Sequence, residues 1–197
     1  MRVTAGEYAG RTLSPPKGPR IRPTQDQVRQ ALFNLLGDAV KGARVLDLFS
    51  GSGALGIEAL SRGASHITFV DRSGYCIEAV RANLEKLVGS DSRKILRGED
   101  PLASILRSDV GQALRRLDRE GRRFDLVFLD PPYGADLARK TLMALTRCAI
   151  VGPAGWVVVE GDKRDPLPAD AASSGCRLVL QRLEQYGDTA LALYRRQ

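Results

Sequence analysis

From residue 44 onward the sequence repeats one pattern, a short apolar strand followed by a turn and an amphipathic helix. Short runs of apolar and β-branched residues predict strands, and apolar residues at helical spacing predict the helices between them. The predicted strands are 44–48, 66–70, 104–109, 124–129, 156–159, 177–183 and 189–194. The predicted helices are 54–62, 75–88, 110–117 and 135–148. This alternation predicts an α/β fold, with a mostly parallel seven-stranded sheet and helices on both faces.

The last two predicted strands, 177–183 and 189–194, differ from the others because no helix separates them. Tyr186-Gly187-Asp188 lies between them and is typical of a tight turn. Two strands joined by a tight turn pair with each other in an antiparallel manner. We therefore expect the sheet to end in a C-terminal antiparallel hairpin.

The strand between the predicted helices 75–88 and 110–117 can be placed in two ways. Lys94–Asp100 and Ser104–Asp109 both combine apolar residues with an acidic end. We favour the second stretch, because residues 110–117 continue it into a helix. Residues 89–101 would then form a loop.

The first 23 residues are rich in glycine, proline and basic side chains, which is typical of a hairpin followed by a loop. Thr24 and Gln27 then have the spacing of a capping box, and apolar residues recur at helical intervals until Gly37. We therefore expect residues 1–23 to form a small basic extension and residues 24–197 to form one α/β domain.

The composition excludes several classes of protein. Apolar residues make up 43% and charged residues 27%, an ordinary globular balance, and no apolar run approaches the roughly 20 residues of a membrane span. The three cysteines form no CxxC pair and there is a single histidine, so no metal site is expected. The N-terminus has no apolar signal core, which predicts a cytoplasmic protein with free thiols.

The net charge of +7 is concentrated near the N-terminus. Residues 1–44 carry eight Lys or Arg against three acidic residues, whereas the remaining 153 residues carry 22 against 20. A local basic excess attracts phosphates, and arginine can bind them through two parallel hydrogen bonds. A solubilising surface is the alternative interpretation. The candidate phosphate contacts are Arg11, Arg20, Arg22 and Arg29.

A glycine-rich turn follows the first predicted strand. Gly51, Gly53 and Gly56 have GxGxxG spacing, and Asp71 follows the second strand. In open α/β sheets ligands bind beyond the carboxyl ends of the strands, where glycine lets the backbone approach them closely. A carboxylate after the second strand can accept hydrogen bonds from ribose hydroxyls. The pattern predicts a nucleoside cofactor, either a dinucleotide or S-adenosylmethionine, and a purely structural turn is the alternative.

Asp47, at the end of the first strand, favours S-adenosylmethionine. Its negative charge would repel a pyrophosphate but would stabilise a cationic sulfonium and amine. A nicotinamide-dependent oxidoreductase is permitted by the glycine spacing, but the chain offers no Tyr-x-x-x-Lys proton donor.

A second motif, Asp130-Pro131-Pro132-Tyr133, directly follows the apolar strand 124–129. Two consecutive prolines cannot continue a strand, and they make the chain rigid. The Asp130 carboxylate and nearby carbonyls could accept both N–H groups of an exocyclic amine on a base and thereby orient its nitrogen, while Tyr133 could stack on the base. An ordinary Asp-Pro turn is the alternative. The motif predicts methyl transfer to an amino group.

Taken together, these motifs resemble the bacterial small-subunit ribosomal RNA guanine-N2 methyltransferases of the RsmD type. The resemblance rests on Asp130–Tyr133, on the turn, and on further segments along nearly the whole chain. These segments are Gly6…Gly10-Arg11, Arg22-Pro23-Thr24, Val28-Arg29…Leu32-Phe33-Asn34, Glu58–Gly63 and Tyr186-Gly187-Asp188-Thr189. One departure is Gln30-Ala31, which stands where an acidic residue is expected.

The resemblance implies a Rossmann-like class I methyltransferase fold, with S-adenosylmethionine as cofactor and the N2 amine of a guanine in 16S rRNA as target, at position 966 for a true family member. The implied cofactor residues are Asp47, Phe49, Ser50, Gly51, Ser52, Gly53, Asp71, Arg72, Asp109, Val110 and Asp130. The implied catalytic residues are Asp130, Pro131, Pro132 and Tyr133. The implied substrate contacts are Arg11, Arg20, Arg22, Thr24, Arg29 and Tyr133.

The partner implied is 16S rRNA, within a 30S subunit or an assembly intermediate, bound by a monomer that does not use a membrane. We expect residues 1–29 to supply affinity for RNA and none for the cofactor. Glu99 and Asp100 are alternatives to Asp109 as the contact of the cofactor's adenine. Adenine-N6 methylation of DNA is the alternative within methyltransferases, although 197 residues leave little room for a sequence-reading domain. A non-catalytic RNA-binding module is a further alternative.

Overall fold

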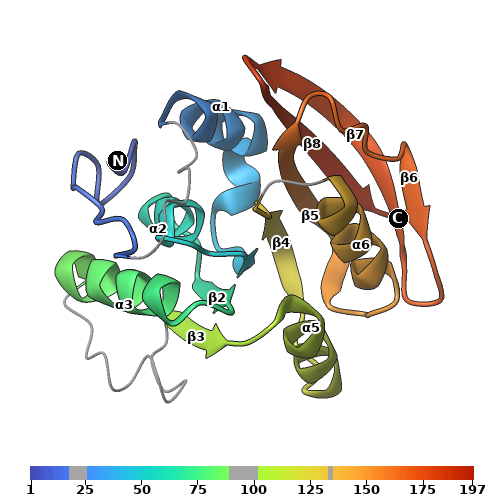
Figure 1. The fold of residues 1–197 in the computed structure, drawn as a ribbon, viewed down its shortest axis with the longest axis horizontal. Coiled ribbons are helices and arrows are strands. Elements are labelled where there is room, and N and C mark those ends of the chain that lie inside the picture. The colour runs from blue at the N-terminus through green and yellow to red at the C-terminus, as the bar shows by residue number, and fades with distance from the viewer. Residues whose placement is uncertain (18–25, 89–101, 133–134) are drawn as a thin grey trace. The chain divides into compact units, whose positions relative to one another are not determined.

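Residues 1–17, 26–88, 102–132 and 135–197 are described by the structure, a computed structural model of the chain (Figure 1). The chain divides into two units, Met1–Asp109 and Val110–Gln197. The expected boundary after Pro23 lies outside the described residues.

In its described residues, the first unit contains three parallel strands in the order β3-β2-β1. They are β1 (Arg44–Leu48), β2 (His66–Asp71) and β3 (Ala103–Arg107). The register pairs Asp47 with Phe69 and Asp71 with Arg107. Because parallel strands end at the same edge of a sheet, Asp47, Asp71 and the residues after Arg107 gather at one edge of this unit.

Within the described residues, two helices connect these strands. α2 (Ala54–Ser61) contacts β1 and β2, and α3 (Gly74–Val88) contacts β2 and β3 (Figure 1). All eight residues of α2 are buried. A Cβ atom added to Gly56 would lie 2.3 Å from Cε1 of Phe69, so the close packing of α2 on β2 requires a glycine here.

Two further segments precede β1. α1 (Asp26–Leu36) continues into the 3-10 helix η1 (Gly37–Val40), and most of the apolar side chains of α1 are buried. The guanidinium of Arg62, just after α2, lies 5.0 Å from the ring centroid of Phe33 in α1. The chain before α1 folds back on itself through an antiparallel bridge between Arg2 and Thr12, which agrees with the expected hairpin.

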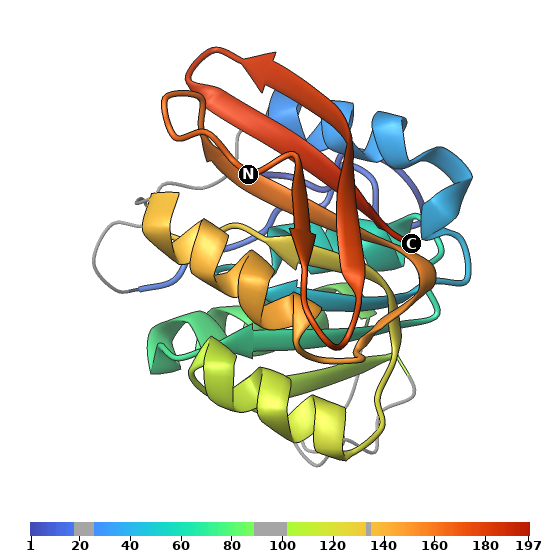
Figure 2. The ribbon, with the colours of Figure 1, turned by 90° about the vertical axis from the view of Figure 1, so that its right-hand side faces the viewer.

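The second unit contains five strands in the order β4-β5-β8-β7-β6. They are β4 (Phe124–Leu129), β5 (Val151–Asp162), β6 (Asp170–Ala172), β7 (Arg177–Tyr186) and β8 (Thr189–Arg196). β4 and β5 are parallel, whereas β5–β8, β8–β7 and β7–β6 are antiparallel. Figure 2 draws these strands in yellow, orange and red. The helices are α5 (Val110–Arg119) and α6 (Ala135–Thr146), and α6 contacts both α5 and β5.

The predicted elements are confirmed, most of them with small changes of boundary, but β5 spans Val151–Asp162 and is much longer than the predicted 156–159. The favoured strand before α5 is β3, and the C-terminal hairpin is present. Among the described residues there are eight strands instead of seven, because Asp170–Ala172 pairs with β7. A strand of three residues is too short to show an alternating pattern, which is why the sequence did not reveal it. No helix within the described ranges is long and apolar enough to cross a membrane.

Candidate functional site

The glycine turn, residues 49–53, leaves β1 and bends sharply back toward β2. The backbone N–H groups of Phe49 and Ser50 both donate to the carbonyl of Val70, at 3.0 Å each, and Gly53 donates to the carbonyl of Ser50 at 2.6 Å. Phe49 has a φ of 85°, a conformation that costs a bulky residue roughly 1–2 kcal/mol. Such strain persists only where surrounding contacts impose it, and it is common at ligand-binding turns.

The three glycines of the motif have different roles. Among the described residues, a Cβ atom added to Gly51 would meet only the Phe49 carbonyl oxygen, at 3.9 Å, so they leave this side of the turn open. A Cβ atom added to Gly53 would lie 3.2–3.4 Å from side chains of the core, whereas Gly56 allows the packing of α2 described above. The turn therefore presents bare backbone at Gly51, where a ligand could approach closely.

Asp71 fastens the turn to the end of β2. One carboxylate oxygen accepts a hydrogen bond from the N–H of Gly51 at 3.0 Å, and the other accepts from Ser73 at 2.8 Å. Each carboxylate oxygen can accept more than one hydrogen bond, so ribose hydroxyls could still bind here. The backbone carbonyl of Asp71 accepts from Ser108, at 3.0 Å, which holds the chain after β3 next to this carboxylate.

Asp47 is 1% exposed, and its Oδ2 accepts a hydrogen bond from the N–H of Gly56 in the first turn of α2 at 3.1 Å. A carboxylate at a helix N-terminus is stabilised by unpaired N–H groups and by the helix dipole. Asp47 therefore has a structural role at the base of the turn, in addition to the cofactor contact that remains a prediction.

Other predicted cofactor residues lie on the same edge of the first unit. Arg72 and Asp109 are exposed, and Asp109 is two residues beyond the end of β3. The hydroxyl of Ser50 is buried and has no hydrogen-bond partner among the described residues. A buried unpaired hydroxyl is costly, and a polar ligand group would relieve that cost. The open turn, this hydroxyl and the Asp71 carboxylate together fit a nucleoside cofactor with a polar tail.

Val110 and the Asp-Pro-Pro-Tyr motif belong to the second unit. Val110 is the first residue of α5 and is half-buried. Asp130 and Pro131 are half-buried and Pro132 is exposed, directly after β4. The motif therefore follows the carboxyl end of a parallel strand, as predicted. Tyr133 lies outside the described residues.

The predicted substrate contacts have different outcomes. Arg11 is exposed and donates through Nη1 to the carbonyl of Leu87 at 3.3 Å. Arg20, Arg22 and Thr24 lie outside the described residues. Arg29, by contrast, is 0% exposed. The expectation that Arg29 contacts an RNA phosphate is therefore wrong, because its guanidinium is buried and donates hydrogen bonds to groups of the protein itself.

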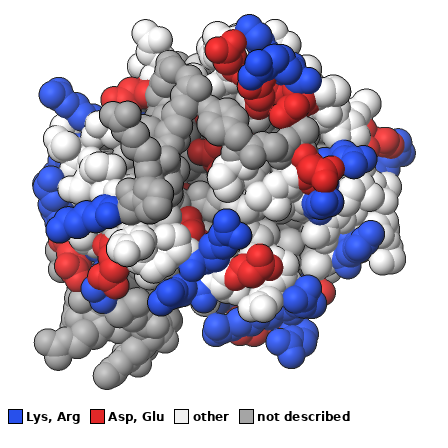
Figure 3. Space-filling view, viewed as in Figure 1, with Lys and Arg blue, Asp and Glu red and all other residues white. Residues whose placement is uncertain are grey.

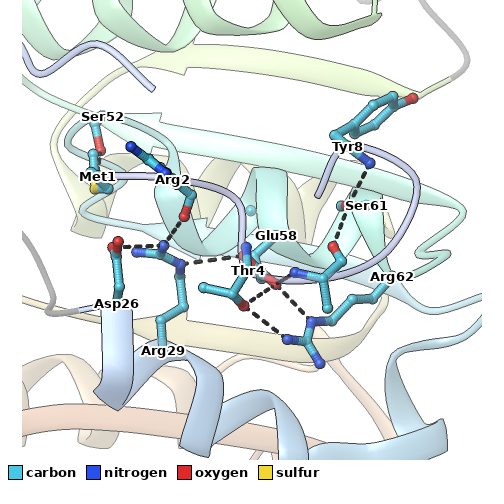
Figure 4. A network of polar contacts seen from close by, with 12 residues as sticks. Met1, Arg2, Thr4, Tyr8, Asp26, Arg29, Ser52, Glu58, Ser61 and Arg62 are labelled. Carbon is cyan, nitrogen blue, oxygen red and sulfur yellow. Dashed lines mark hydrogen bonds and ion pairs between the residues drawn. The ribbon is translucent and has the colours of Figure 1, made fainter. Parts of the chain in front are cut away.

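Arg29 belongs to a buried network around Glu58 (Figure 4). The carboxylate of Glu58 accepts hydrogen bonds from the N–H and hydroxyl of Thr4, at 2.8 and 2.6 Å, and from Arg62 at 2.8 Å. Arg29 lies 3.4 Å from the same carboxylate, donates to Asp26 at 2.9 Å and donates to the carbonyl of Arg2. The network joins the N-terminal residues, α1 and α2.

The same contacts set the charge of Glu58. Burial alone would raise the pKa of this carboxyl, but the hydrogen bonds from Thr4 and Arg62 outweigh burial and hold the pKa below its ordinary value. Glu58 therefore stays ionised at neutral pH, and its charge is balanced by two arginines.

Sequence reasoning missed Asn83 as a residue of this site. Asn83 lies in α3 on the face that carries Val80, Leu84 and Leu87, and it is 1% exposed. Its side chain donates to the carbonyl of Ser52 in the glycine turn at 2.9 Å. A polar residue on an otherwise apolar helix face was the signal that could have revealed it.

Charged side chains of both signs cover the face shown in Figure 3, with Lys and Arg interspersed with Asp and Glu. In the described part of the chain, many exposed arginines have an acidic partner nearby, such as Arg116 with Glu120 and Arg139 with Asp136. The basic excess of the first 44 residues is therefore the stronger indication of a phosphate-binding surface.

Comparisons with known proteins cover the whole chain. A family model described as "Conserved hypothetical protein 95" matches residues 1–195. YlbH of Bacillus subtilis (strain 168), which is named as a candidate rRNA methyltransferase, is 37% identical over 196 residues, or 100% of this chain and 99% of the relative. "Ribosomal RNA small subunit methyltransferase D" of Escherichia coli (strain K12) is 32% identical over 197 residues, or 100% of this chain and 90% of the relative.

A solved structure agrees with these relatives. A candidate methyltransferase of Escherichia coli superposes with a TM-score of 0.79 at 31% identity, over 100% of this chain and 98% of the other. This likeness confirms the Rossmann-like class I methyltransferase fold that the motifs implied.

Proposed function

Because this chain belongs to the family described as "Conserved hypothetical protein 95", we propose that it transfers a methyl group from S-adenosylmethionine to the N2 amine of a guanine in 16S rRNA. The observation that carries the proposal is the glycine turn, which is open at Gly51 and fastened to the Asp71 carboxylate at 3.0 Å. The name of the Escherichia coli relative supports a small-subunit rRNA as substrate. The guanine-N2 specificity rests on the motif resemblance.

The first unit would hold the cofactor. Asp71 would accept hydrogen bonds from the ribose hydroxyls, and the backbone at Gly51 and the hydroxyl of Ser50 would contact the methionine part. Asp47 would stabilise the cationic groups through its negative charge, which α2 already holds in place. Asp109, just beyond β3, would contact the adenine. When bound, S-adenosylmethionine supplies an electrophilic methyl group.

The second unit would hold the target amine. Asp130 would accept an N–H bond of the exocyclic amine and so direct the nitrogen lone pair toward the methyl group. Pro131 and Pro132 would limit the movement of this acceptor, because a proline ring fixes φ. Tyr133 would stack on the guanine, which must leave its helix or be unpaired for its amine to be reached.

Residues 1–23 would act as the RNA-binding arm and residues 24–197 as the methyltransferase domain, acting as a monomer. The substrate would be 16S rRNA within a 30S subunit or an assembly intermediate, which places the reaction in the cytoplasm. Arg11 is exposed within this arm and could meet a phosphate, since its one described hydrogen bond to Leu87 uses a single nitrogen.

Methyl transfer from labelled S-adenosylmethionine tests the proposal directly. The enzyme would be incubated with a 16S rRNA transcript, with unmodified 30S particles and with DNA, and the labelled nucleosides would be identified. We expect label in N2-methylguanosine from one of the two RNA substrates. Label in N6-methyladenine of DNA, or in no nucleoside, would contradict the proposal.

Calorimetric titration separates the cofactor classes. S-adenosylhomocysteine is expected to bind, whereas NAD is not, because the buried carboxylate of Asp47 at the base of the turn would repel its pyrophosphate. Binding of NAD alone would instead support an oxidoreductase.

A further inference from the structure

Asn83 connects the glycine turn to the N-terminal segment, which we define as residues 1–17. Its side-chain amide donates to the carbonyl of Ser52 at 2.9 Å and to the carbonyl of Ser14 at 3.0 Å. Its side-chain oxygen accepts a hydrogen bond from the N–H of Ser14 at 2.9 Å. One buried side chain thus makes three hydrogen bonds to two backbone segments that are 38 residues apart in sequence.

The two segments also touch each other. The hydroxyl of Ser52 lies 3.8 Å from the sulfur of Met1, a contact visible at one side of Figure 4. Ser52 therefore meets the N-terminal segment through its side chain and meets Asn83 through its carbonyl oxygen. A shift of the turn at Ser52 would disturb both contacts.

α3 holds the N-terminal segment at further points. Lys86 donates to the carbonyl of Thr12 at 3.1 Å, and Arg11 donates to the carbonyl of Leu87 at 3.3 Å. The same helix starts at Gly74, three residues after Asp71, and Ser73 donates to the Asp71 carboxylate at 2.8 Å. α3 therefore runs from the predicted ribose contact to the N-terminal segment.

Leaving the buried side-chain amide of Asn83 without hydrogen-bond partners would cost free energy. At 1% exposure, water cannot replace its partners, so its three hydrogen bonds favour one arrangement of the turn together with one arrangement of the N-terminal segment. A ligand that stabilises either arrangement stabilises the other as well, and such coupling is reciprocal.

We propose that Asn83 is a positioning residue that couples the N-terminal segment to the glycine turn, so that cofactor and RNA bind cooperatively. The inference rests on the proposed function, because it takes the N-terminal segment as the RNA contact and the turn as the cofactor contact. It replaces the expectation that residues 1–29 contribute nothing to the cofactor site.

The coupling is measured from one ratio. It is the dissociation constant of S-adenosylhomocysteine without RNA divided by its value at saturation with the RNA that the wild type methylates, either the 16S rRNA transcript or the unmodified 30S particle. We expect a ratio of about 5 or more for the wild type, since allosteric couplings span roughly 5- to 150-fold. Asn83→Ala is expected to bring the ratio to about 1. Asn83→Asp keeps the acceptor for Ser14 but loses both donated bonds, so it is expected to lose the coupling too.

Asn34→Ala is the matched control. Asn34 is an exposed residue of a helix in the same unit and lies outside the contacts described above, so the ratio is expected to stay at the wild-type value. A general loss of stability would weaken both dissociation constants without changing their ratio, which separates coupling from a merely structural role.

Hydrogen exchange gives a second readout that needs no variant. The N–H of Ser14 donates to Asn83, so its exchange is expected to slow when S-adenosylhomocysteine is added to the wild type. Two results would overturn the coupling. One is unchanged exchange of the Ser14 N–H together with a wild-type ratio near 1, and the other is a ratio in Asn83→Ala that stays at the wild-type value. If the wild type neither binds S-adenosylhomocysteine nor methylates the transcript or the 30S particle, the proposed function itself fails. A wild type that methylates with a ratio near 1 contradicts the coupling alone.

Discussion

Single carboxylates at the ends of strands carry most of the predicted chemistry, and Asp71 has the clearest geometry. It holds the N–H of Gly51 at 3.0 Å and is expected to accept two ribose hydroxyls. Each hydrogen bond to a charged group is worth roughly 1.5–3 kcal/mol, so Asp71→Ala should weaken binding of S-adenosylhomocysteine by about 100-fold or more. Calorimetry measures this change, and circular dichroism should show an unchanged fold. Asp38→Ala, which removes an exposed carboxylate of the same unit, is the control and should bind S-adenosylhomocysteine as the wild type does.

Asp130 and Tyr133 are expected to differ in what they contribute. Orienting an amine matters only as the methyl is transferred, so Asp130→Ala should lower turnover by orders of magnitude and leave RNA affinity nearly unchanged. Stacking is worth roughly 1–3 kcal/mol per base, so Tyr133→Ala should lower both base capture and rate, whereas Tyr133→Phe should retain much activity. Single-turnover methylation at saturating cofactor compares the three variants. Near-normal turnover in Asp130→Ala would remove the main support for a catalytic role of this loop.

At the scale of elements, the Glu58 network fastens α1, α2 and the N-terminal segment to one another. Glu58→Gln replaces a carboxylate oxygen by an NH2 group that faces donors from Thr4 and the two arginines. Breaking a buried ion pair costs roughly 3–5 kcal/mol, so a loss of unfolding free energy of that order is expected at pH 7. Urea unfolding checks it. Glu78→Gln changes an exposed carboxylate of α3 that pairs with Arg81, and it should cost roughly 0.5 kcal/mol or less.

The same network predicts a pH dependence. Since the pKa of Glu58 is lowered on folding, the carboxylate contributes stability that is fully present above its ordinary value of 4.5 and is lost as pH falls through the lower folded value. Unfolding free energies measured as the pH is lowered below 4.5 should therefore fall more steeply for the wild type than for Glu58→Gln. Parallel slopes would show that Glu58 does not carry this dependence.

For the whole molecule, the uneven charge predicts how RNA binding responds to salt. Each lost phosphate contact lowers the slope of log affinity against log salt by about 0.9 on a duplex or about 0.7 on a single strand. Replacing Arg11, Arg20 and Arg22 with alanine should therefore flatten the slope measured with a 16S rRNA transcript. Three exposed arginines that already have acidic partners are the charge-matched control. They are Arg116, Arg139 and Arg182.

The control variant loses the same net charge, so a purely general effect of charge would flatten both slopes equally. An unchanged slope with unchanged affinity in the Arg11, Arg20 and Arg22 variant would mean that the basic extension is only a solubilising surface.

The sequence by itself determined the elements and their chemistry, because each depends on local patterns. Strands 44–48 and 124–129 have the predicted boundaries, and the glycine turn and the hairpin at Gly187 follow from residues that tolerate tight backbone geometry. The order Gly51, Gly53, Gly56 and then Asp71 also predicted a glycine turn after the first strand and a carboxylate after the second, whereas the hydrogen bond that joins them at 3.0 Å is known only from the structure.

Only the tertiary structure decided how polar side chains are used, because burial and pairing depend on residues far away in the chain. Arg29 looks like a phosphate contact in sequence, but Glu58, 29 residues later, and the N-terminal residues enclose it. Asn83 looks like one polar residue in an amphipathic helix, yet it joins Ser14 to Ser52. Local patterns determine where a chain turns and which face is apolar, whereas the partner of a buried polar group is determined by which segments the fold brings together.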